Sequence, residues 1–175
     1  MTVKPIIIVG FMGSGKTTVA LELARQLSCR AIDLDELIME REKRSPKEII
    51  EQDGEEGFRE TETRMLREVL DEGVARVIAV GGGAWTIAVN RKLMADRAAF
   101  VAWLDASFEL CWKRIEASRK TRPLARSREL AQKLYDERGP IYELADARIK
   151  IHENESAEEI AKKVAVFSGG GREPS

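Results

Sequence analysis

Residues 10–17 read Gly-Phe-Met-Gly-Ser-Gly-Lys-Thr, and this stretch decides the fold. It fits the pattern Gly-x-x-x-x-Gly-Lys-[Ser/Thr] of a phosphate-binding loop. The loop follows an apolar, β-branched run, Ile6 to Val9, which indicates a buried strand, and it precedes a stretch of helical periodicity from Thr17 to Leu27. A strand, a glycine-rich loop and a helix in this order predict a nucleotide-binding P-loop in an α/β domain.

The residue types of the loop predict its chemistry. Glycines let backbone N–H groups crowd around phosphate oxygens, and the N-terminus of the following helix adds a favourable dipole. We expect Lys16 to reach the β- and γ-phosphates of ATP and the Thr17 hydroxyl to bind Mg²⁺. The predicted ATP-binding residues of the loop are Gly13, Ser14, Gly15, Lys16, Thr17 and Thr18.

The composition excludes several classes of protein. Lysine plus arginine (29) nearly balances aspartate plus glutamate (30) among 175 residues, which argues against a nucleic-acid or membrane-surface partner. Cys29 and Cys111 are too far apart for a zinc motif or a disulfide framework, so we expect a cytoplasmic protein. The apolar run before the P-loop is far shorter than the ~20 residues of a membrane span, and we interpret it as a strand rather than a signal peptide. No exposed apolar stripe is predicted, so a monomer is expected.

Apolar, strand-like runs alternate with helical stretches along the chain, which predicts an α/β fold with a mostly parallel sheet. We expect one domain over residues 1–168 and a disordered tail over residues 169–175. The predicted strands are Ile6–Val9, Ala31–Ile32, Val77–Val80, Phe100–Leu104 and Ile149–Ile151.

Several helix boundaries are marked by the sequence. Ser45-Pro46-Lys47-Glu48 is a capping box, and the helix that it starts should end near Gly54. A long helix follows from Glu55 to Leu70. Ser156 caps a last helix through about Phe167, and we expect the Phe167 side chain to point inward.

Two carboxylates, Asp33 and Asp35, follow the second predicted strand. Ligands of parallel α/β sheets bind at the carboxyl ends of strands, so both side chains can face the active crevice. Asp33 could then lie near the P-loop Mg²⁺, and Asp35 could accept the proton of a substrate hydroxyl. The alternative is a loop pair that caps the next helix, and the residues alone leave both open.

Residues 117–128 are rich in arginine and poor in apolar side chains. One interpretation is a solvated surface loop. The other, favoured here because the chain carries a P-loop, is a mobile lid over residues 115–128 that closes on phosphates. The basic residues of this segment are Arg119, Lys120, Arg122, Arg126 and Arg128.

Three further features are candidates for binding. Gly81-Gly82-Gly83 follows the third strand, where glycines allow close approach of backbone to a ligand or form a plain turn. Arg59 near the start of the long helix and Arg138 before Pro140 could each bind a carboxylate or face solvent. Trp85 could pack on the ligand or cover the sheet. The lone His152 is interpreted as structural or solvated.

In order along the chain, these motifs resemble the shikimate kinase family from Ile6 to about Phe167. The resemblance is carried by a set rather than by the P-loop alone. The set comprises the P-loop, Asp33-x-Asp35, Gly54-Glu55-Glu56-Gly57-Phe58-Arg59, Gly81-Gly82-Gly83, Arg122-Pro123-Leu124, and Arg138 before Pro140 and Tyr142.

The resemblance implies phosphorylation of the 3-hydroxyl of shikimate by ATP, on the route to chorismate and aromatic amino acids. It implies a P-loop three-layer fold with a five-stranded parallel sheet in the order 2-3-1-4-5, helices on both faces, the mobile lid, and a substrate-binding helical region over residues 33–62. It assigns shikimate to Asp35, Arg59, Gly81, Gly82, Gly83 and Arg138, catalysis to Asp35, Lys16 and Arg122, metal to Thr17 and Asp33, and ATP additionally to Arg114 and Arg122.

Two positions depart from the family pattern. Ala79 stands where a hydroxyl residue is frequent, and Trp85 is bulkier than the small aliphatic residue expected there, so it could narrow or reshape the pocket. Other functions stay open: a kinase of gluconate or of a nucleoside monophosphate, an ATP-binding regulatory module, or nucleic-acid binding through the arginines. The paired carboxylates and the lid would serve the other kinases too, but the glycine run Gly81-Gly82-Gly83 with Arg59 and Arg138 favours a cyclic hydroxy-acid.

Overall fold

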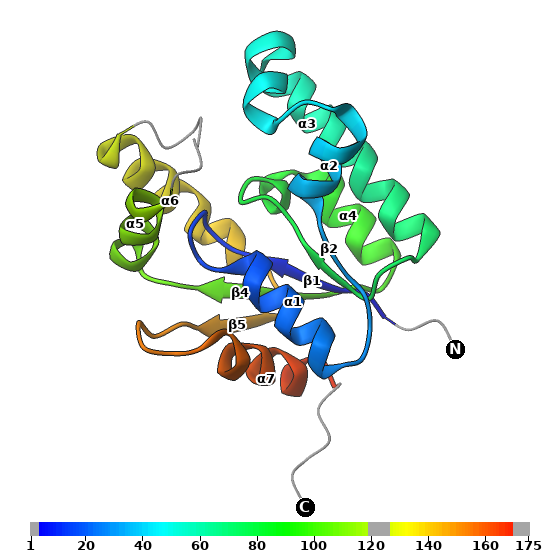
Figure 1. Ribbon diagram of the computed structural model, residues 1–175, viewed down its shortest axis with the longest axis vertical. Coiled ribbons are helices and arrows are strands. Elements are labelled where there is room, and N and C mark those ends of the chain that lie inside the picture. Colours follow the sequence, from blue (N-terminus) through cyan, green and yellow to red (C-terminus); the bar gives the residue numbers. More distant parts are fainter. Residues whose placement is uncertain (1–3, 119–126, 170–175) are drawn as a thin grey trace, which may run out of the picture.

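Five parallel strands form the centre of the chain, in the order β2-β3-β1-β4-β5 (Figure 1). The computed structural model describes residues 4–118 and 127–169. The predicted fold class and strand order are confirmed. The strands are β1 (Ile6–Val9), β2 (Ala31–Asp33), β3 (Val77–Ala79), β4 (Phe100–Asp105) and β5 (Ala147–Lys150).

The last strand differs from the prediction, because it begins at Ala147 rather than Ile149. β5 is an edge strand whose residues alternate between buried and exposed, with Arg148 and Lys150 facing solvent. A search for continuous apolar runs therefore finds only its last part. β1, in contrast, is buried at every residue and pairs with β3 and β4 on its two sides.

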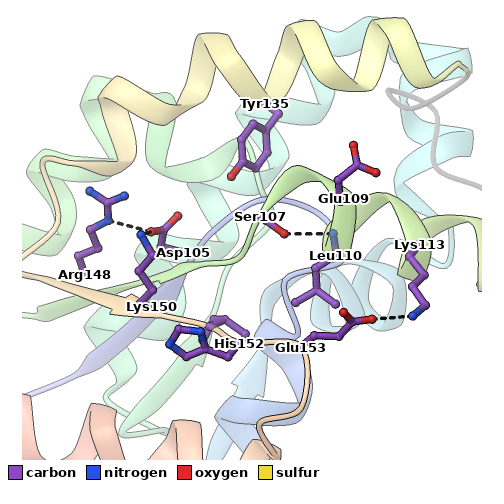
Figure 2. A pocket seen from close by; sticks show the side chains of 11 residues that line it. Asp105, Ser107, Glu109, Leu110, Lys113, Tyr135, Arg148, Lys150, His152 and Glu153 are labelled. Carbon is purple, nitrogen blue, oxygen red and sulfur yellow. Dashed lines mark hydrogen bonds and ion pairs between the residues drawn. The ribbon is translucent and has the colours of Figure 1, made fainter.

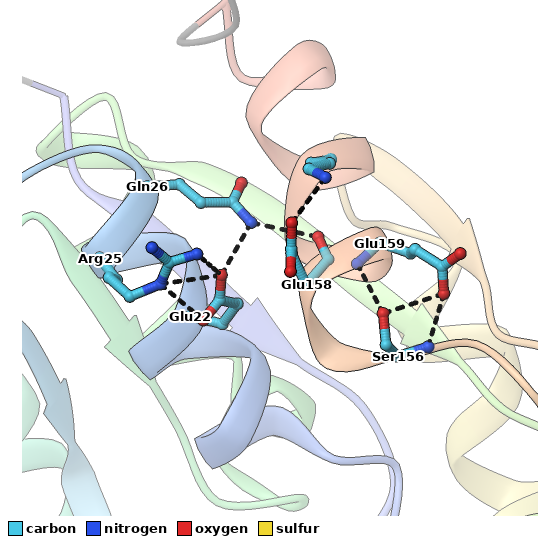
Figure 3. Close-up of polar contacts among 7 residues, drawn as sticks. Glu22, Arg25, Gln26, Ser156, Glu158 and Glu159 are labelled. Atoms are coloured by element: carbon cyan, nitrogen blue, oxygen red, sulfur yellow. Dashed lines mark hydrogen bonds and ion pairs between the residues drawn. The ribbon is translucent and has the colours of Figure 1, made fainter.

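Helices cover both faces of the sheet. α1 and α7 pack against each other on one face, and α3, α4 and α6 lie on the opposite side (Figure 1). The Gln26 side chain of α1 donates to the Glu158 backbone carbonyl of α7 at 3.1 Å (Figure 3). The helices are α1 (Lys16–Gln26), α2 (Leu34–Glu42), α3 (Pro46–Glu72), α4 (Ala88–Asp96), α5 (Phe108–Ala117), α6 (Arg128–Tyr142) and α7 (Ala157–Phe167), with the 3-10 turn η1 (Ala84–Thr86).

Both predicted capping boxes are present. Ser45 accepts from the Glu48 N–H at the start of α3, and Ser156 accepts from the Glu159 N–H at the start of α7 (Figure 3). The predicted helix break at Gly54 is a kink inside α3, where Gly54 has φ 79° and ψ 172°. The residues expected on the buried face of the long helix, Phe58, Met65, Leu66 and Val69, are all buried.

One core prediction is wrong. Phe167 is 60% exposed, although Ile160 and Val164 of the same helix are buried as expected. The buried stripe of α7 ends at Ala165, and Phe167 is the last residue of the helix, beyond that stripe. None of the helices in the described part of the chain combines the length and the apolar content that a bilayer span requires.

Candidate active site

The predicted site residues gather where β1, β2 and β3 end. The P-loop follows β1, Asp33 is the last residue of β2, and the glycine run follows β3. These three strands are neighbours in the sheet, so the loops after them meet at its carboxyl edge. A pocket of about 500 Å³ opens there, and its lining includes Thr17, Asp33, Asp35, Arg59, Gly81, Gly82, Gly83 and Arg138.

The P-loop has a backbone conformation that depends on glycine. Gly13 has φ +81°, and a Cβ atom there would lie 2.6 Å from the carbonyl oxygen of Cys111 in α5. Any side chain at this position would therefore collide with the α5 backbone. No side chain caps α1 at Gly15. The first-turn N–H groups of a helix lack helical carbonyls to bind, so with the helix dipole they form an anion site.

Two cations lie against this loop. The Lys16 ammonium donates to the backbone oxygens of Gly10 and Phe11 at 2.9 and 3.0 Å. Arg114 of α5 donates from Nη1 to the Gly13 carbonyl oxygen at 3.1 Å. The loop's own carbonyl groups thus hold both positive charges beside the place where phosphate would bind. The contact of Arg114 with adenine stays a prediction.

Asp33 caps the next helix and also contacts the P-loop, whereas its role at Mg²⁺ stays a prediction. Its Oδ1 accepts the N–H groups of Asp35 and Glu36 at 3.0 and 3.1 Å and so caps α2. Its Oδ2 accepts the hydroxyl of Thr17. The cap thus fixes the carboxylate with its second oxygen turned to the P-loop.

The Thr17–Asp33 pair fits a magnesium ion as far as its donor chemistry is concerned, because Mg²⁺ prefers hard oxygen ligands. Within residues 4–118 and 127–169, no group of three or more His, Cys, Asp or Glu side chains is placed to hold a metal. A Mg²⁺ ion here would therefore take most of its ligands from phosphate oxygens and water, as is usual for this ion.

Asp35 lies in the first turn of α2, next to the glycine run. A Cβ atom on Gly81 would be 3.1 Å from Asp35 Oδ1 and 2.8 Å from Glu62 Oε1. Two carboxylates thus approach the same glycine from α2 and α3. α2 itself is anchored by Leu34 and Ile38, which are both fully buried. Asp35 is therefore held in the lining of the pocket, where a substrate hydroxyl could donate a hydrogen bond to it.

Arg59 extends from α3 over the glycine run. Its guanidinium lies so near Gly83 that a Cβ there would be 2.4 Å from Arg59 Nη2. Its Nη1 donates to Glu62 Oε2 at 2.9 Å, and the guanidinium carbon lies 5.2 Å from the centre of the Phe58 ring. The ion pair with Glu62 and the contact with the Phe58 ring together hold the Arg59 guanidinium in a fixed orientation.

Glu62 is a residue of this site that sequence reasoning missed. Its side chain is fully buried, and burial raises its pKa to about 7, against the opposing charge of Arg59. The sequence contains a feature that could have identified this residue, because Glu62 interrupts the apolar face of α3 between Phe58 and Met65. A carboxylate at a core position of a helix usually has a buried partner, which here is the arginine one turn earlier.

Arg138 completes the pocket from α6. It is 6% exposed, and burial lowers the pKa of its guanidinium. A Cβ on Gly82 would lie 3.1 Å from Arg138 Nη1, so this arginine also rests against the glycine run. Two guanidinium groups from distant helices therefore converge on adjacent glycines. Together they can bind a carboxylate, which accepts two parallel hydrogen bonds from an arginine fork.

The two departures from the family pattern have different consequences. Ala79 is buried inside β3, opposite Ile8 and Asp33, and contributes no hydroxyl group. Trp85 does not line the pocket, which argues against the alternatives in which it narrows the pocket or packs on the ligand. Its side chain is 6% exposed, and Nε1 donates to the backbone oxygen of Ile141 at 2.9 Å. The bulk of Trp85 is thus buried between η1 and the end of α6.

Most of the predicted lid lies outside the described residues, and so do Arg119, Lys120, Arg122 and Arg126. Arg128, the last arginine of that segment, is described. It is the first residue of α6, it pairs with Glu109 of α5, and its guanidinium carbon lies 5.2 Å from the centre of the Phe108 ring. Arg128 thus contacts α5 rather than the pocket.

A larger hollow of about 650 Å³ lies elsewhere, between α5, α6 and the end of β5 (Figure 2). It contains none of the predicted catalytic or binding residues. Charged side chains line it, but they pair with one another: Arg148 with Asp105 at 2.8 Å, and Lys113 with Glu153 at 2.6 Å. The exposed His152 lies at its rim, consistent with a solvated residue. The predicted site residues therefore lie in the smaller pocket and not in this one.

Comparisons with known proteins agree on one family. A family model described as "Shikimate kinase" matches residues 12–167. The chain is 40% identical to a shikimate kinase of Geobacter sulfurreducens over 168 residues, covering 94% of this chain and 90% of the relative. It is similar in structure to a shikimate kinase from Acinetobacter baumannii in complex with shikimate, with TM-score 0.85, 34% identity, and coverage of 96% and 94% of the two chains.

Proposed function

The chain belongs to the shikimate kinase family, and we propose that it carries out the reaction of that family with the residues that meet at the carboxyl edge of its sheet. It is an ATP-dependent phosphotransferase, which transfers the γ-phosphate of ATP to the 3-hydroxyl of shikimate and yields shikimate 3-phosphate and ADP. The observation that carries the residue assignment is the pair of guanidinium groups, Arg59 and Arg138, in one pocket with Asp35 and Thr17.

The pocket fits the chemistry of shikimate, a small ring with one carboxylate and three hydroxyl groups. Arg59 and Arg138 bind the carboxylate, and the glycine run Gly81–Gly83 brings backbone close to the ring. Asp35 accepts hydrogen bonds from ring hydroxyl groups. The relative from Acinetobacter baumannii, with shikimate bound, supports shikimate as the substrate.

The P-loop end binds ATP and orients its phosphates. Lys16 contacts the β- and γ-phosphates, residues 13–18 donate backbone hydrogen bonds, and Arg114 lies beside the loop. A magnesium ion, held by the Thr17 hydroxyl and assisted by Asp33, supplies neutralisation of phosphate charge when bound. Arg122 of the proposed lid over residues 115–128 closes on the phosphates and excludes water.

Phosphoryl transfer depends more on the alignment of the hydroxyl with the γ-phosphate than on a strong base. The 3-hydroxyl oxygen attacks the γ-phosphorus in line, while the bond from that phosphorus to the β,γ-bridging oxygen breaks and ADP leaves. Asp35 aims the hydroxyl and accepts its proton as the new bond forms. Since the transition state is loose, correct alignment and charge neutralisation supply most of the rate.

The remaining proposals concern the protein as a whole. Residues 1–168 form one kinase domain, with residues 33–62 as the substrate-binding helical region and residues 169–175 as a tail. The protein works as a cytoplasmic monomer. The family assignment and the scarcity of cysteine support this location.

A coupled assay of ADP release tests the function. ATP and Mg²⁺ are supplied with shikimate, with gluconate, with a nucleoside monophosphate, or with no acceptor. We expect ADP only with shikimate, together with shikimate 3-phosphate. Folded protein that binds ATP but phosphorylates gluconate or a nucleotide instead would overturn the substrate assignment. ADP release without any acceptor would contradict the proposed exclusion of water.

A further inference from the structure

Two hydrogen bonds join the loop after β3 to the last turn of α6, and they are reciprocal. The Trp85 indole N–H of the loop donates to the backbone oxygen of Ile141 in α6 at 2.9 Å. The Tyr142 hydroxyl of α6 donates to the backbone oxygen of Gly82 in the loop. Each segment thus supplies one side chain and one carbonyl group. We call this pair of bonds the clasp.

The last turn of α6 depends on such outside contacts because Pro140 lies within it. Proline has no N–H, so the carbonyl of Asp136 loses its helical hydrogen bond, and the ring crowds the preceding turn. Arg138 lies between these two residues. Its backbone is therefore in the part of α6 with the weakest internal support, and the clasp begins three residues later.

The Tyr142 ring is held rigidly. The residue is 2% exposed, and its ring stacks on Trp103 of β4 with centroids 5.8 Å apart and planes inclined by 26°. The Arg138 guanidinium lies against the same glycine that accepts from the Tyr142 hydroxyl, because a Cβ atom on Gly82 would be 3.1 Å from Arg138 Nη1. The tyrosine, which is fixed against the sheet, and the buried arginine of the pocket thus meet at one glycine.

We propose that Tyr142 is a positioning residue, whose hydroxyl fixes the Arg138 guanidinium relative to Gly82 and so determines how tightly the substrate carboxylate is bound, with Trp85 as the second half of the clasp. This inference rests on the proposed function. The carboxylate does not react, so its contacts are the same before and during phosphoryl transfer. Loss of the hydroxyl should therefore raise KM for shikimate and leave kcat nearly unchanged.

The test compares Tyr142→Phe with a matched control on the same helix. Tyr135→Phe also removes a tyrosine hydroxyl that donates to a backbone carbonyl, that of Ala106 at 2.8 Å, but outside the substrate pocket. For Tyr142→Phe we expect KM for shikimate to rise about tenfold, the upper end of what the loss of one buried hydrogen bond causes. KM for ATP and kcat should stay within about twofold, and Tyr135→Phe should change none of the three.

Two further arms separate positioning from general damage. Trp85→Phe keeps an aromatic ring but loses the indole N–H and part of the ring volume, and we expect a smaller rise in the same KM. The methyl ester of shikimate has no carboxylate charge, and its KM should differ little between wild type and Tyr142→Phe. A crystal structure of Tyr142→Phe should show the Arg138 guanidinium displaced from Gly82.

Equal losses for both substrates, an unchanged KM for shikimate, or an unmoved Arg138 in the variant would overturn the proposal. Wild-type protein that does not phosphorylate shikimate would instead refute the proposed function. In that case the variant structure alone decides whether the hydroxyl positions Arg138.

Discussion

The parts of the site that we propose bind phosphate and carboxylate, called here the phosphate end and the carboxylate end, differ in how the chain forms them. The phosphate end is formed mainly by one continuous segment, residues 10–18, which presents backbone N–H groups shaped by glycine. The carboxylate end is assembled from Arg59 in α3, the glycines after β3, and Arg138 in α6. A contiguous site is complete once its segment has folded, whereas an assembled site exists only when three distant elements pack correctly.

The ends also differ in what surrounds their charges. At the carboxylate end, Arg138 is 6% exposed and Glu62 is fully buried. Charges taken out of water must be paired, and removal of one partner leaves the other uncompensated. At the phosphate end, the Lys16 side chain is only partly buried and is held by carbonyl groups. Substitutions at the carboxylate end should therefore affect stability as well as binding.

The largest effect is expected at the phosphate end. Lys16→Ala removes the cation that contacts the β- and γ-phosphates, so we expect kcat to fall by roughly 10³ or more, with little change in melting temperature. Lys113→Ala is the control, because that lysine is exposed and pairs with Glu153. Steady-state kinetics and thermal melts measure both. Near-normal turnover by Lys16→Ala would refute the role of the P-loop.

At the carboxylate end, Arg59→Ala should raise KM for shikimate far more than KM for ATP. The loss of one arginine fork from a buried carboxylate corresponds to roughly 2–4 kcal/mol. Arg64→Ala is the control on the same helix, since Arg64 is half exposed and bonds Glu42 at 2.6 Å. Equal changes for both substrates would mean that Arg59 only supports the fold.

The buried carboxyl of Glu62 gives the carboxylate end a pH dependence. Burial raises its pKa from 4.5 to about 7, so the folded protein binds more protons between these values. The stability that this group contributes is fully present below about pH 4.5 and is lost as pH rises through about 7. Glu62→Gln should remove this dependence, which amounts to at most about 3 kcal/mol in the free energy of unfolding.

Urea unfolding of wild type and Glu62→Gln at several pH values between 4.5 and 8 measures this difference. Glu68→Gln, a partly exposed carboxylate on the same helix, should follow the wild-type curve. An unchanged slope for Glu62→Gln would show that the pKa of the Glu62 carboxyl is the same in the folded and the unfolded protein.

The smallest expected effects come from the two capping boxes, one of which lines the pocket while the other lies outside it. Ser45→Ala and Ser156→Ala should each lower the free energy of unfolding by about 1 kcal/mol, because each removes an equivalent N-cap. Only Ser45 borders the pocket, so only Ser45→Ala should also raise KM for shikimate. A similar rise for Ser156→Ala would show that any loss of stability weakens binding.

The sequence predicted the local structure of the P-loop, a strand followed by a glycine loop and a helix, because its residues are adjacent in the chain. The contacts of these residues with phosphate stay predictions. The strand order came from family resemblance and is confirmed. The break at Gly54 was also predictable, since glycine adopts φ 79° at little cost.

The partners at the carboxylate end were less predictable. Nothing in the spacing of Arg59, Gly83 and Arg138 shows that they meet, and only the resemblance brought them together. Glu62 was missed, and Tyr142 was noted only as part of the motif after Arg138, because their contacts depend on burial and on packing that the sequence does not show. Phe167 was misplaced for a related reason, since periodicity gives the face of a helix but not where its packing partners end.

The position of β1 has a consequence for synthesis on the ribosome. β1 precedes the other four strands in the chain but lies at the centre of the sheet, between β3 and β4. At about 5–20 residues per second, several seconds pass before Phe100 and the rest of β4 emerge. Until then Ile6-Ile7-Ile8-Val9 lacks at least one of its two neighbouring strands, and an apolar strand with an open edge is the kind of segment that nascent-chain chaperones bind and that aggregates when they are absent.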